Sequence, residues 1–320
     1  MPLMPVNPNT TRARVMLEIA SELAGTPLQG FAQAEVTLTP FGQSSVPPTR
    51  LRSHSTIDSI EAVLSRQADV AIINPVAALN MAVRGTGPYS APVPLRAIAV
   101  IPSEDQFVFA VRKETGLTTV EEIAARRIPL RVSLRGQPDH CLHMMLDQVL
   151  AAAGFSLDAM KSWGGTPKRE GTLPWPDSAK FQAFAKGEID AIFDEASYIW
   201  VAEALDAGAT ILPLSEPTVR KLEAIGLRRA IIRKSAFPKL PADVLTVDFS
   251  GWPIFVHAET SDRLVTQICA SLDARKGSIP GEDGKPLPVE RMCREAPDTP
   301  QDVPLHPAAE RFWRQRGYLD

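Results

Sequence analysis

Residues 116–156, GLTTVEEIAARRIPLRVSLRGQPDHCLHMMLDQVLAAAGFS, decide the fold of this chain. Thr118 and Thr119 each stand three residues before a glutamate, which is the capping-box spacing that begins a helix. Residues 130–134 predict a buried strand, and apolar residues at helical spacing predict a second helix over 139–153. A strand between two helices is typical of an α/β fold with a mainly parallel sheet.

The same alternation extends along the chain in both directions. Further strands are predicted at residues 35–40, 68–74, 95–101, 107–112, 189–193, 210–214 and 229–232. Further helices are predicted at 11–23, 56–66, 76–84, 178–186, 197–207, 219–225, 261–274 and 307–317. Proline and glycine predict loops at 162–177 and 277–304.

Two such blocks predict two lobes joined by two hinge crossings. One crossing enters the strand at 107–112, and the other is the extended segment 247–257, which a Ser-Gly pair interrupts. We therefore expect lobe 1 at residues 1–106 plus 253–320 and lobe 2 at 107–252. A ligand in such a fold lies in the cleft between the lobes, at strand ends and helix starts.

Length and charge exclude several classes of protein. A chain of 320 residues exceeds what one hydrophobic core commonly serves, which agrees with two lobes. The net charge of −3 leaves no basic excess, so we expect no nucleic-acid partner. No apolar run reaches the ~20 residues of a membrane-spanning helix. The first residues do not resemble a signal peptide, so a removed export signal and a protein that is not exported both stay open.

Motifs for catalysis and metal binding are missing. The sequence holds no G-x-S-x-G, H-E-x-x-H, P-loop or strand-linked G-x-G-x-x-G motif, so we expect neither an enzyme nor a cofactor. His140 and His143 share a helix face, but no third ligand is placed beside them, so we predict no metal site. Cys141, Cys269 and Cys293 are expected to be buried thiols, although a Cys269–Cys293 bridge stays open in an oxidising compartment.

Four passages carry a resemblance to a known family. They are the capped helix and strand ending in QADVAIIN (67–74), the stretch 116–156, FAKGEIDAIFDEAS (184–197) and PLHPAAERFWRQRGYL (304–319). In this order they resemble the TAXI-type solute receptors of tripartite (TRAP) transporters, within the type II periplasmic binding protein superfamily. The resemblance implies a periplasmic monomer that binds a small organic anion between two lobes and meets the membrane subunits of a TRAP-type transporter.

The loops that would touch the ligand differ from the family. Its first strand and glycine-rich loop are replaced by MPVNPNTTR (4–12), and its Gly-Ser pair before the second helix by His54-Ser55. Its glycine- and hydroxyl-rich segment after the strand at 130–134 is replaced by RGQPDH (135–140). The resemblance therefore implies the fold and the cleft, whereas the family's glutamate-like and dicarboxylate ligands do not transfer.

Hydrogen-bonding residues at helix starts and strand ends form the predicted site on lobe 1. The predicted contacts there are Asn9, Thr10, Arg12, Ser55, Thr56 and Asn74. The first three lie in a predicted loop before a helix, where backbone N–H groups favour anions, and helix capping is the alternative. The serine and threonine open the next helix and either cap it or contact the ligand. The asparagine ends a buried strand and either points into the cleft or forms a turn with the following proline.

Charged residues dominate the predicted site on lobe 2. The predicted contacts are Arg135, Gln137, Asp139, His140, Asp194, Glu195, Tyr198 and, in the return crossing, Trp252. Arg135 follows a buried strand, so its guanidinium either grips a carboxylate with two parallel hydrogen bonds or lies on the surface. Asp194 and Glu195 end another buried strand and could accept hydrogen bonds from the ligand, act as an acid-base pair, or serve the fold alone. Trp252 either walls the pocket or packs in the core.

Two functions from different classes fit this sequence. We expect a solute-binding protein without catalysis, which captures a carboxylate-bearing solute for a TRAP-type transporter. The alternative is a cytoplasmic enzyme of decarboxylase or dehydratase type, or a small-molecule sensor, on the same scaffold. An export signal upstream, beside genes for transporter subunits, would favour the receptor.

Overall fold

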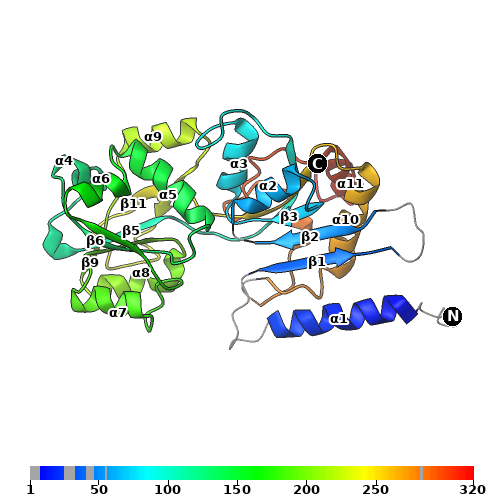
Figure 1. The fold of residues 1–320 in the computed structure, drawn as a ribbon, viewed down its shortest axis with the longest axis horizontal. Helices are drawn as coiled ribbons and strands as arrows, with labels where there is room; N and C mark the ends of the chain where they lie inside the picture. Colours follow the sequence, from blue (N-terminus) through cyan, green and yellow to red (C-terminus); the bar gives the residue numbers. More distant parts are fainter. Residues whose placement is uncertain (1–7, 25–32, 41–46, 55, 282–283) are drawn as a thin grey trace.

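The computed structural model describes residues 8–24, 33–40, 47–54, 56–281 and 284–320. These residues form two α/β lobes side by side, each built on its own five-stranded sheet (Figure 1). The predicted α/β fold with two lobes is confirmed. The expectation of a mainly parallel sheet was wrong, because three of the four strand pairings described in one sheet and two of the four in the other are antiparallel. Among the described residues, no helix is long and apolar enough to cross a membrane.

Lobe 1 is built on the sheet β1-β2-β3-β12-β4. Its strands are β1 (Ala34–Leu38), β2 (Thr49–Ser53), β3 (Val70–Ile72), β12 (Trp252–His257) and β4 (Leu95–Ile101). Its helices are α1 (Pro8–Ala24), α2 (Asp58–Leu64), α3 (Val76–Arg84), α10 (Asp262–Arg275) and α11 (Pro307–Gln315), with the 3-10 turn η2 (Val289–Arg291). β2 and β3 are parallel, whereas β12 lies antiparallel between β3 and β4, and β1 is antiparallel to β2.

Lobe 2 is built on the sheet β7-β6-β8-β5-β9. Its strands are β7 (Thr166–Arg169), β6 (Arg131–Leu134), β8 (Ala191–Asp194), β5 (Val108–Arg112) and β9 (Ala209–Ile211), and β10 (Arg229–Ile232) and β11 (Val244–Val247) form a separate hairpin. Its helices are η1 (Lys113–Thr115), α4 (Glu121–Ala125), α5 (Cys141–Ala152), α6 (Leu157–Ser162), α7 (Ala179–Lys186), α8 (Ser197–Asp206) and α9 (Glu216–Ala224). β7, β6 and β8 are parallel, and β5 is antiparallel to both of its neighbours.

The two crossings between the lobes pair with each other. The Phe249 N–H donates to the Asp105 carbonyl (2.9 Å), and the Phe107 N–H donates to the Val247 carbonyl (3.0 Å). Gly251 has a φ of +75°, and a Cβ there would lie 2.8 Å from a proline ring, so the position requires glycine. The crossings therefore form a short antiparallel ribbon that joins the lobes.

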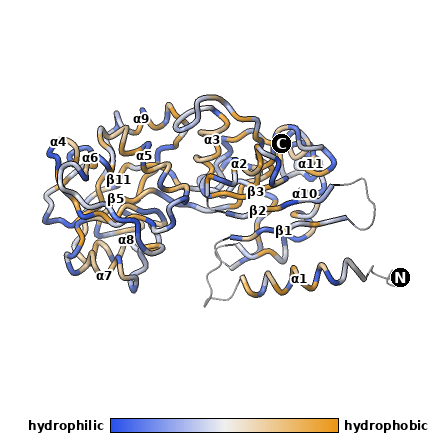
Figure 2. The backbone as a smooth tube through the Cα atoms, viewed as in Figure 1, coloured by the Kyte–Doolittle hydropathy of each residue, from blue (hydrophilic) through white to orange (hydrophobic). Residues whose placement is uncertain are grey.

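The lobes also share one cluster of buried apolar side chains. It includes Leu79 and Met81 of α3 in lobe 1 and Met145 and Leu146 of α5 in lobe 2. Figure 2 shows apolar residues in the interior of both lobes. Burial of apolar surface stabilises packing in proportion to its area, so this contact holds the lobes together in addition to the crossings.

Most predicted elements are confirmed, and the differences include a loop, a strand and the start of a helix. The stretch 162–177 contains β7, which pairs with β6, and β2 lies where no strand was predicted. β2 was missed because its alternate residues are arginines rather than apolar residues. α1 begins at Pro8, earlier than predicted, because proline is well tolerated in the first turn of a helix. The three cysteines are free and buried, as expected.

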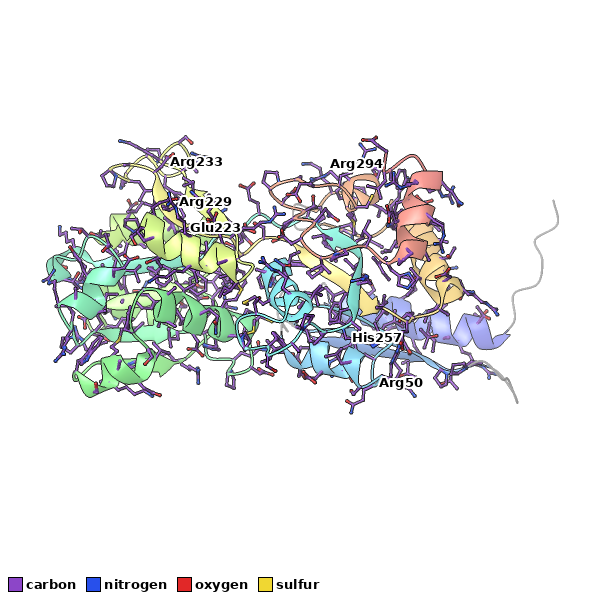
Figure 3. The ribbon with its side chains drawn as sticks, turned by 90° about the horizontal axis from the view of Figure 1, so that it is seen from above. Arg50, Glu223, Arg229, Arg233, His257 and Arg294 are labelled. Carbon is purple, nitrogen blue, oxygen red and sulfur yellow. The ribbon has the colours of Figure 1, made fainter. Side chains whose placement is uncertain are left out.

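Ion pairs also tie lobe 2 elements together at the surface. Arg229 of β10 pairs with Glu223 of α9 at 2.7 Å, and Figure 3 shows the two side chains next to each other. Such exposed pairs contribute little to stability. The charged groups that can shape a site are therefore the buried ones.

Candidate functional site

A buried arginine lies between two carboxylates at the ends of β6 and β8. Arg135 Nη2 donates to Asp194 Oδ1 at 2.6 Å and also to Glu195 Oε1. All three residues are buried. Burial alone would lower the pKa of Arg135, but the two carboxylates outweigh it and raise that pKa. The guanidinium is therefore charged and held in one orientation.

Lys180 of α7 completes this cluster, and the sequence analysis missed it. Its ammonium group donates to the Leu134 carbonyl at 3.1 Å and to Asp194 Oδ2 at 3.4 Å. Burial lowers the pKa of Lys180, against the opposing effect of Asp194. Lys180 thus holds both the strand end that carries Arg135 and the carboxylate that pairs with it. Lys180 lies on the apolar face of a predicted amphipathic helix, and this position could have indicated a buried, paired lysine.

Asp105 connects the cluster to the crossing. Its carboxylate accepts hydrogen bonds from the N–H groups of Ala196 (2.8 Å) and Ser197 (3.1 Å) at the start of α8. Burial, and then the neighbouring Glu195, raise the pKa of Asp105 well above its usual value. Any movement of the crossing is therefore coupled to the residues that hold Arg135.

The lobes meet on the other side of Arg135. A β-bridge joins Thr56 of lobe 1 to His140 of lobe 2, and both residues are buried. His140 accepts the Leu142 N–H through Nδ1 and caps α5. Burial, and then the charge of Arg135, lower the pKa of His140 to about 3, so its ring is neutral at neutral pH. The Arg135 cluster is therefore linked to the crossing through Asp105 and lies close enough to His140 to lower its pKa.

Several buried polar atoms around this boundary have no hydrogen-bond partner among the described residues. In lobe 1 they are Ser59 Oγ and Asn74 Oδ1, and in lobe 2 they are Ser133 Oγ, Arg135 Nε and His143 Nδ1. Buried polar atoms in native proteins are nearly always satisfied by protein, water or a ligand. These atoms are consequently the hydrogen-bonding capacity that a bound molecule could use.

The structure brings only part of the predicted site together. Arg135, Asp194, Glu195 and His140 are buried in one region, and Thr56 reaches it across the lobe boundary. Gln137 is half-buried, with its carbonyl 2.9 Å from His143 Nε2, whereas Asp139 and Tyr198 are exposed. Trp252 is half-buried in β12, opposite Ile101 of β4. Ser55 lies outside the described residues.

The predicted anion loop near the N-terminus was wrong. Asn9, Thr10 and Arg12 belong to α1 itself rather than to a loop before it, and the Asn9 side chain lies outside the described part. Thr10 and Arg12 are exposed. The expected loop before the helix is therefore wrong, and contact of these residues with a solute stays a prediction.

A second set of contacts crosses the lobe boundary at α3. Asn80 is buried and donates to the Gly226 carbonyl at 2.7 Å, and Thr86 donates to the Ile225 carbonyl at 2.5 Å. Arg228 of lobe 2 pairs with Glu295 (2.6 Å) and Asp302 in the C-terminal loop. These contacts lie away from the Arg135 cluster, and they help to fix the orientation of the two lobes.

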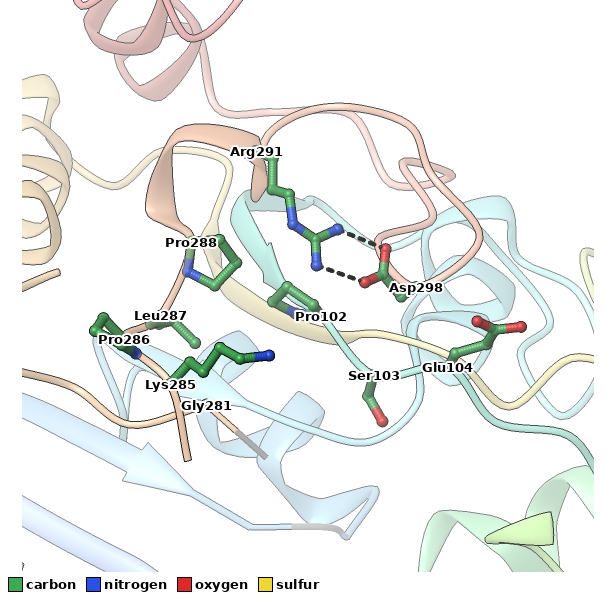
Figure 4. Close-up of a pocket in the computed structure, with 10 residues that line it drawn as sticks. All are labelled: Pro102, Ser103, Glu104, Gly281, Lys285, Pro286, Leu287, Pro288, Arg291 and Asp298. Atoms are coloured by element: carbon green, nitrogen blue, oxygen red, sulfur yellow. Dashed lines mark hydrogen bonds and ion pairs between the residues drawn. The ribbon is translucent and has the colours of Figure 1, made fainter. Parts of the chain in front are cut away.

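The surface also has hollows that are not lined by Arg135, Lys180, Asp194 or Glu195. One of about 360 Å³ lies between the β4–β5 crossing and the C-terminal loop, where Arg291 pairs with Asp298 at 2.8 Å (Figure 4). Lys285 and Glu104 also line it. Among the described residues, no group of three or more His, Cys, Asp or Glu side chains could hold a metal ion.

Comparison with known proteins places the chain in a family. Residues 36–317 match the NMT1-like family. The matched residues make up most of both lobes. The chain belongs to the NMT1-like family. No curated protein matches this NMT1-like chain.

Solved structures with some similarity to this NMT1-like protein include three solute-binding proteins. The alkanesulfonate-binding protein SsuA from Xanthomonas axonopodis pv. citri, bound to MOPS, is 17% identical over 80% of this chain and 69% of that chain, with a TM-score of 0.34. An ancestral arginine-binding protein bound to arginine is 16% identical over 69% and 71%, with a TM-score of 0.33. A TctC solute-binding protein from Polaromonas is 19% identical over 64% and 62%, with a TM-score of 0.33.

Proposed function

We propose that this NMT1-like protein is a solute-binding protein that holds a small carboxylate-bearing solute between its lobes. The observation that carries the proposal is Arg135, whose guanidinium is buried at the end of β6 while its Nε has no partner among the described residues. A guanidinium matches a carboxylate through two parallel hydrogen bonds. A solute carboxylate would therefore satisfy a donor that the protein leaves open.

The solute carboxylate competes with one of the two protein carboxylates. Asp194 is held by Lys180 and by the Glu195 N–H (3.0 Å) as well as by Arg135. The Glu195 carboxylate has the Arg135 guanidinium on one side and the buried Asp105 carboxyl group on the other, and it raises the pKa of Asp105. Glu195 is therefore the partner that the solute displaces, while Asp194 stays in place.

The assignment to a type of transporter, a location and exact lobe bounds rests on the four sequence passages that resemble TAXI-type receptors. It comprises a periplasmic monomer, with lobes at residues 1–106 plus 253–320 and 107–252, that delivers its solute to the membrane subunits of a TRAP-type transporter. Binding without turnover is the expected chemistry, since the buried Asp105 and Glu195 serve the crossing and Arg135. A decarboxylase- or dehydratase-like enzyme on this scaffold is the competing function.

Native mass spectrometry of the full chain tests the proposal. The panel contains small mono- and dicarboxylic acids, the neutral amide of each acid, and amines of similar size. The expected result is one acid bound per chain and recovered unchanged, with its amide bound far more weakly. Equal binding of acid and amide would contradict carboxylate recognition, and recovery of a converted molecule would favour the enzyme.

A further inference from the structure

Helix α1 carries an apolar stripe that faces solvent. Val15, Met16, Ile19 and Leu23 are 46–65% exposed. They recur at the spacing that places residues on one face of a helix, whereas Arg14 and Glu18 form an ion pair on another face. Amphipathic helices of this kind bury their apolar face against another element, so the stripe requires a partner surface.

Lobe 1 has an uncovered apolar hollow on one face of its sheet. The hollow measures about 210 Å³, and its apolar lining includes Val36, Leu51, Ile72, Ile254, Ile268 and Leu272. The first four belong to β1, β2, β3 and β12, and the last two to α10. α10 therefore forms one wall of this hollow, and β1 and β2 form part of another.

Helix α1 is placed next to this hollow. Glu18 Oε1 lies 3.9 Å from Nη2 of Arg275, the last residue of α10. Figures 1 and 3 both show α1 alongside α10, and Figure 1 shows it running beside β1. Residues 25–33 alone connect α1 to β1, which itself lines the hollow. Such a short connection gives α1 a high effective concentration at the hollow of its own chain.

We propose that α1 docks its apolar stripe into this lobe 1 hollow of its own chain. Ile19 and Leu23 lie one turn apart and fill the hollow between β1 and α10, while the Glu18–Arg275 pair guides the approach. Docking removes two apolar surfaces from water at once. α1 then becomes a structural layer of lobe 1.

Disulfide trapping tests the docking in the full chain. Ile19→Cys is combined with Leu272→Cys, and the matched control combines Arg14→Cys, on another face of α1, with Leu272→Cys. The native cysteines are buried, and peptide mapping distinguishes their products. Docking predicts an intrachain 19–272 disulfide in most molecules and at least fivefold less of the 14–272 disulfide. Equal yields for the two pairs, no 19–272 product, or a disulfide between two chains would overturn the proposal.

A second measurement tests the docking if the cysteine variants fold poorly. Ile19→Glu places a charge in the stripe, whereas Leu17→Glu places it outside the stripe. Docking predicts that Ile19→Glu lowers the Tm by several degrees while Leu17→Glu leaves it unchanged. Equal Tm values for both variants and the wild type would overturn the proposal.

Discussion

The ammonium group of Lys180 lies 3.4 Å from Asp194 Oδ2, where the lysine side chain is 1% exposed. Replacing Lys180 with methionine keeps the volume but leaves a buried carboxylate with one cationic partner. Breaking a buried pair from one side costs about 3–5 kcal/mol, and urea unfolding should show a loss of this size. The control Lys161→Met removes the exposed pair with Asp158 and should leave stability unchanged. A Lys180→Met variant as stable as the wild type would rule out the bridging role.

The proposed binding of a solute carboxylate to Arg135 makes Glu195 the competitor of that carboxylate. Glu195→Gln removes the charge that competes with the solute carboxylate, so a carboxylate found in the screen should bind several-fold more tightly. Fluorescence or calorimetric titration measures the change. Glu188→Gln, at an exposed site before β8, is the control and should bind like the wild type. Weaker binding by Glu195→Gln alone would show that Glu195 contacts the solute instead of competing with it.

Asn80 holds α3 against the end of α9. Asn80→Ala leaves the Gly226 carbonyl without its donor at a buried position, which costs about 1–3 kcal/mol. Urea unfolding measures the loss. Gln182→Ala removes a similar side-chain amide bond at an exposed site, to the Pro176 carbonyl, and should change stability much less. The interface would be dispensable if both variants matched the wild type.

Asp248 makes the stability of the crossing depend on pH. Burial raises the pKa of Asp248 to about 6, above the value near 3.8 expected when unfolded. The protonated carboxyl is thus favoured in the folded state, so its contribution is complete below about pH 4 and is lost as the pH rises to about 6. Asp248→Asn lacks this titration. Its stability relative to the wild type should therefore rise by at most about 1.4 kcal/mol per pH unit over this interval.

Unfolding of the wild type and Asp248→Asn between pH 4 and pH 7 measures this difference. The Lys234 N–H lowers the pKa of the exposed Asp243, so Asp243→Asn must not show the same rise. A stability difference between Asp248→Asn and the wild type that is flat with pH would contradict the assignment.

The sequence predicted the fold well where burial sets the pattern. β4 has the predicted bounds because most of its apolar residues are buried inside lobe 1. β2 and β7 carry arginine, lysine and proline, and they become strands only because a neighbouring strand pairs with them. That pairing is a tertiary property that local pattern does not contain.

The site was predicted in part for a similar reason. Arg135 and Asp194 follow buried strands, and parallel strands end at the same edge of a sheet, so their proximity could be expected. Their mutual pairing could not, because the sequence gives no distances between side chains. Lys180 was missed because its burial depends on how α7 packs against β6 and β8.

Calorimetric titration of the Arg135→Gln variant with the carboxylate that binds the wild type most tightly tests the central claim most directly. Loss of the charge-assisted pair should weaken binding by more than tenfold, which corresponds to about 1.4 kcal/mol. The matched variant is Arg131→Gln, at the first residue of β6, where the arginine is paired with Asp190 at the surface; this variant should bind like the wild type. Equal affinity of Arg135→Gln and the wild type would contradict the assignment of Arg135 as the carboxylate-binding group.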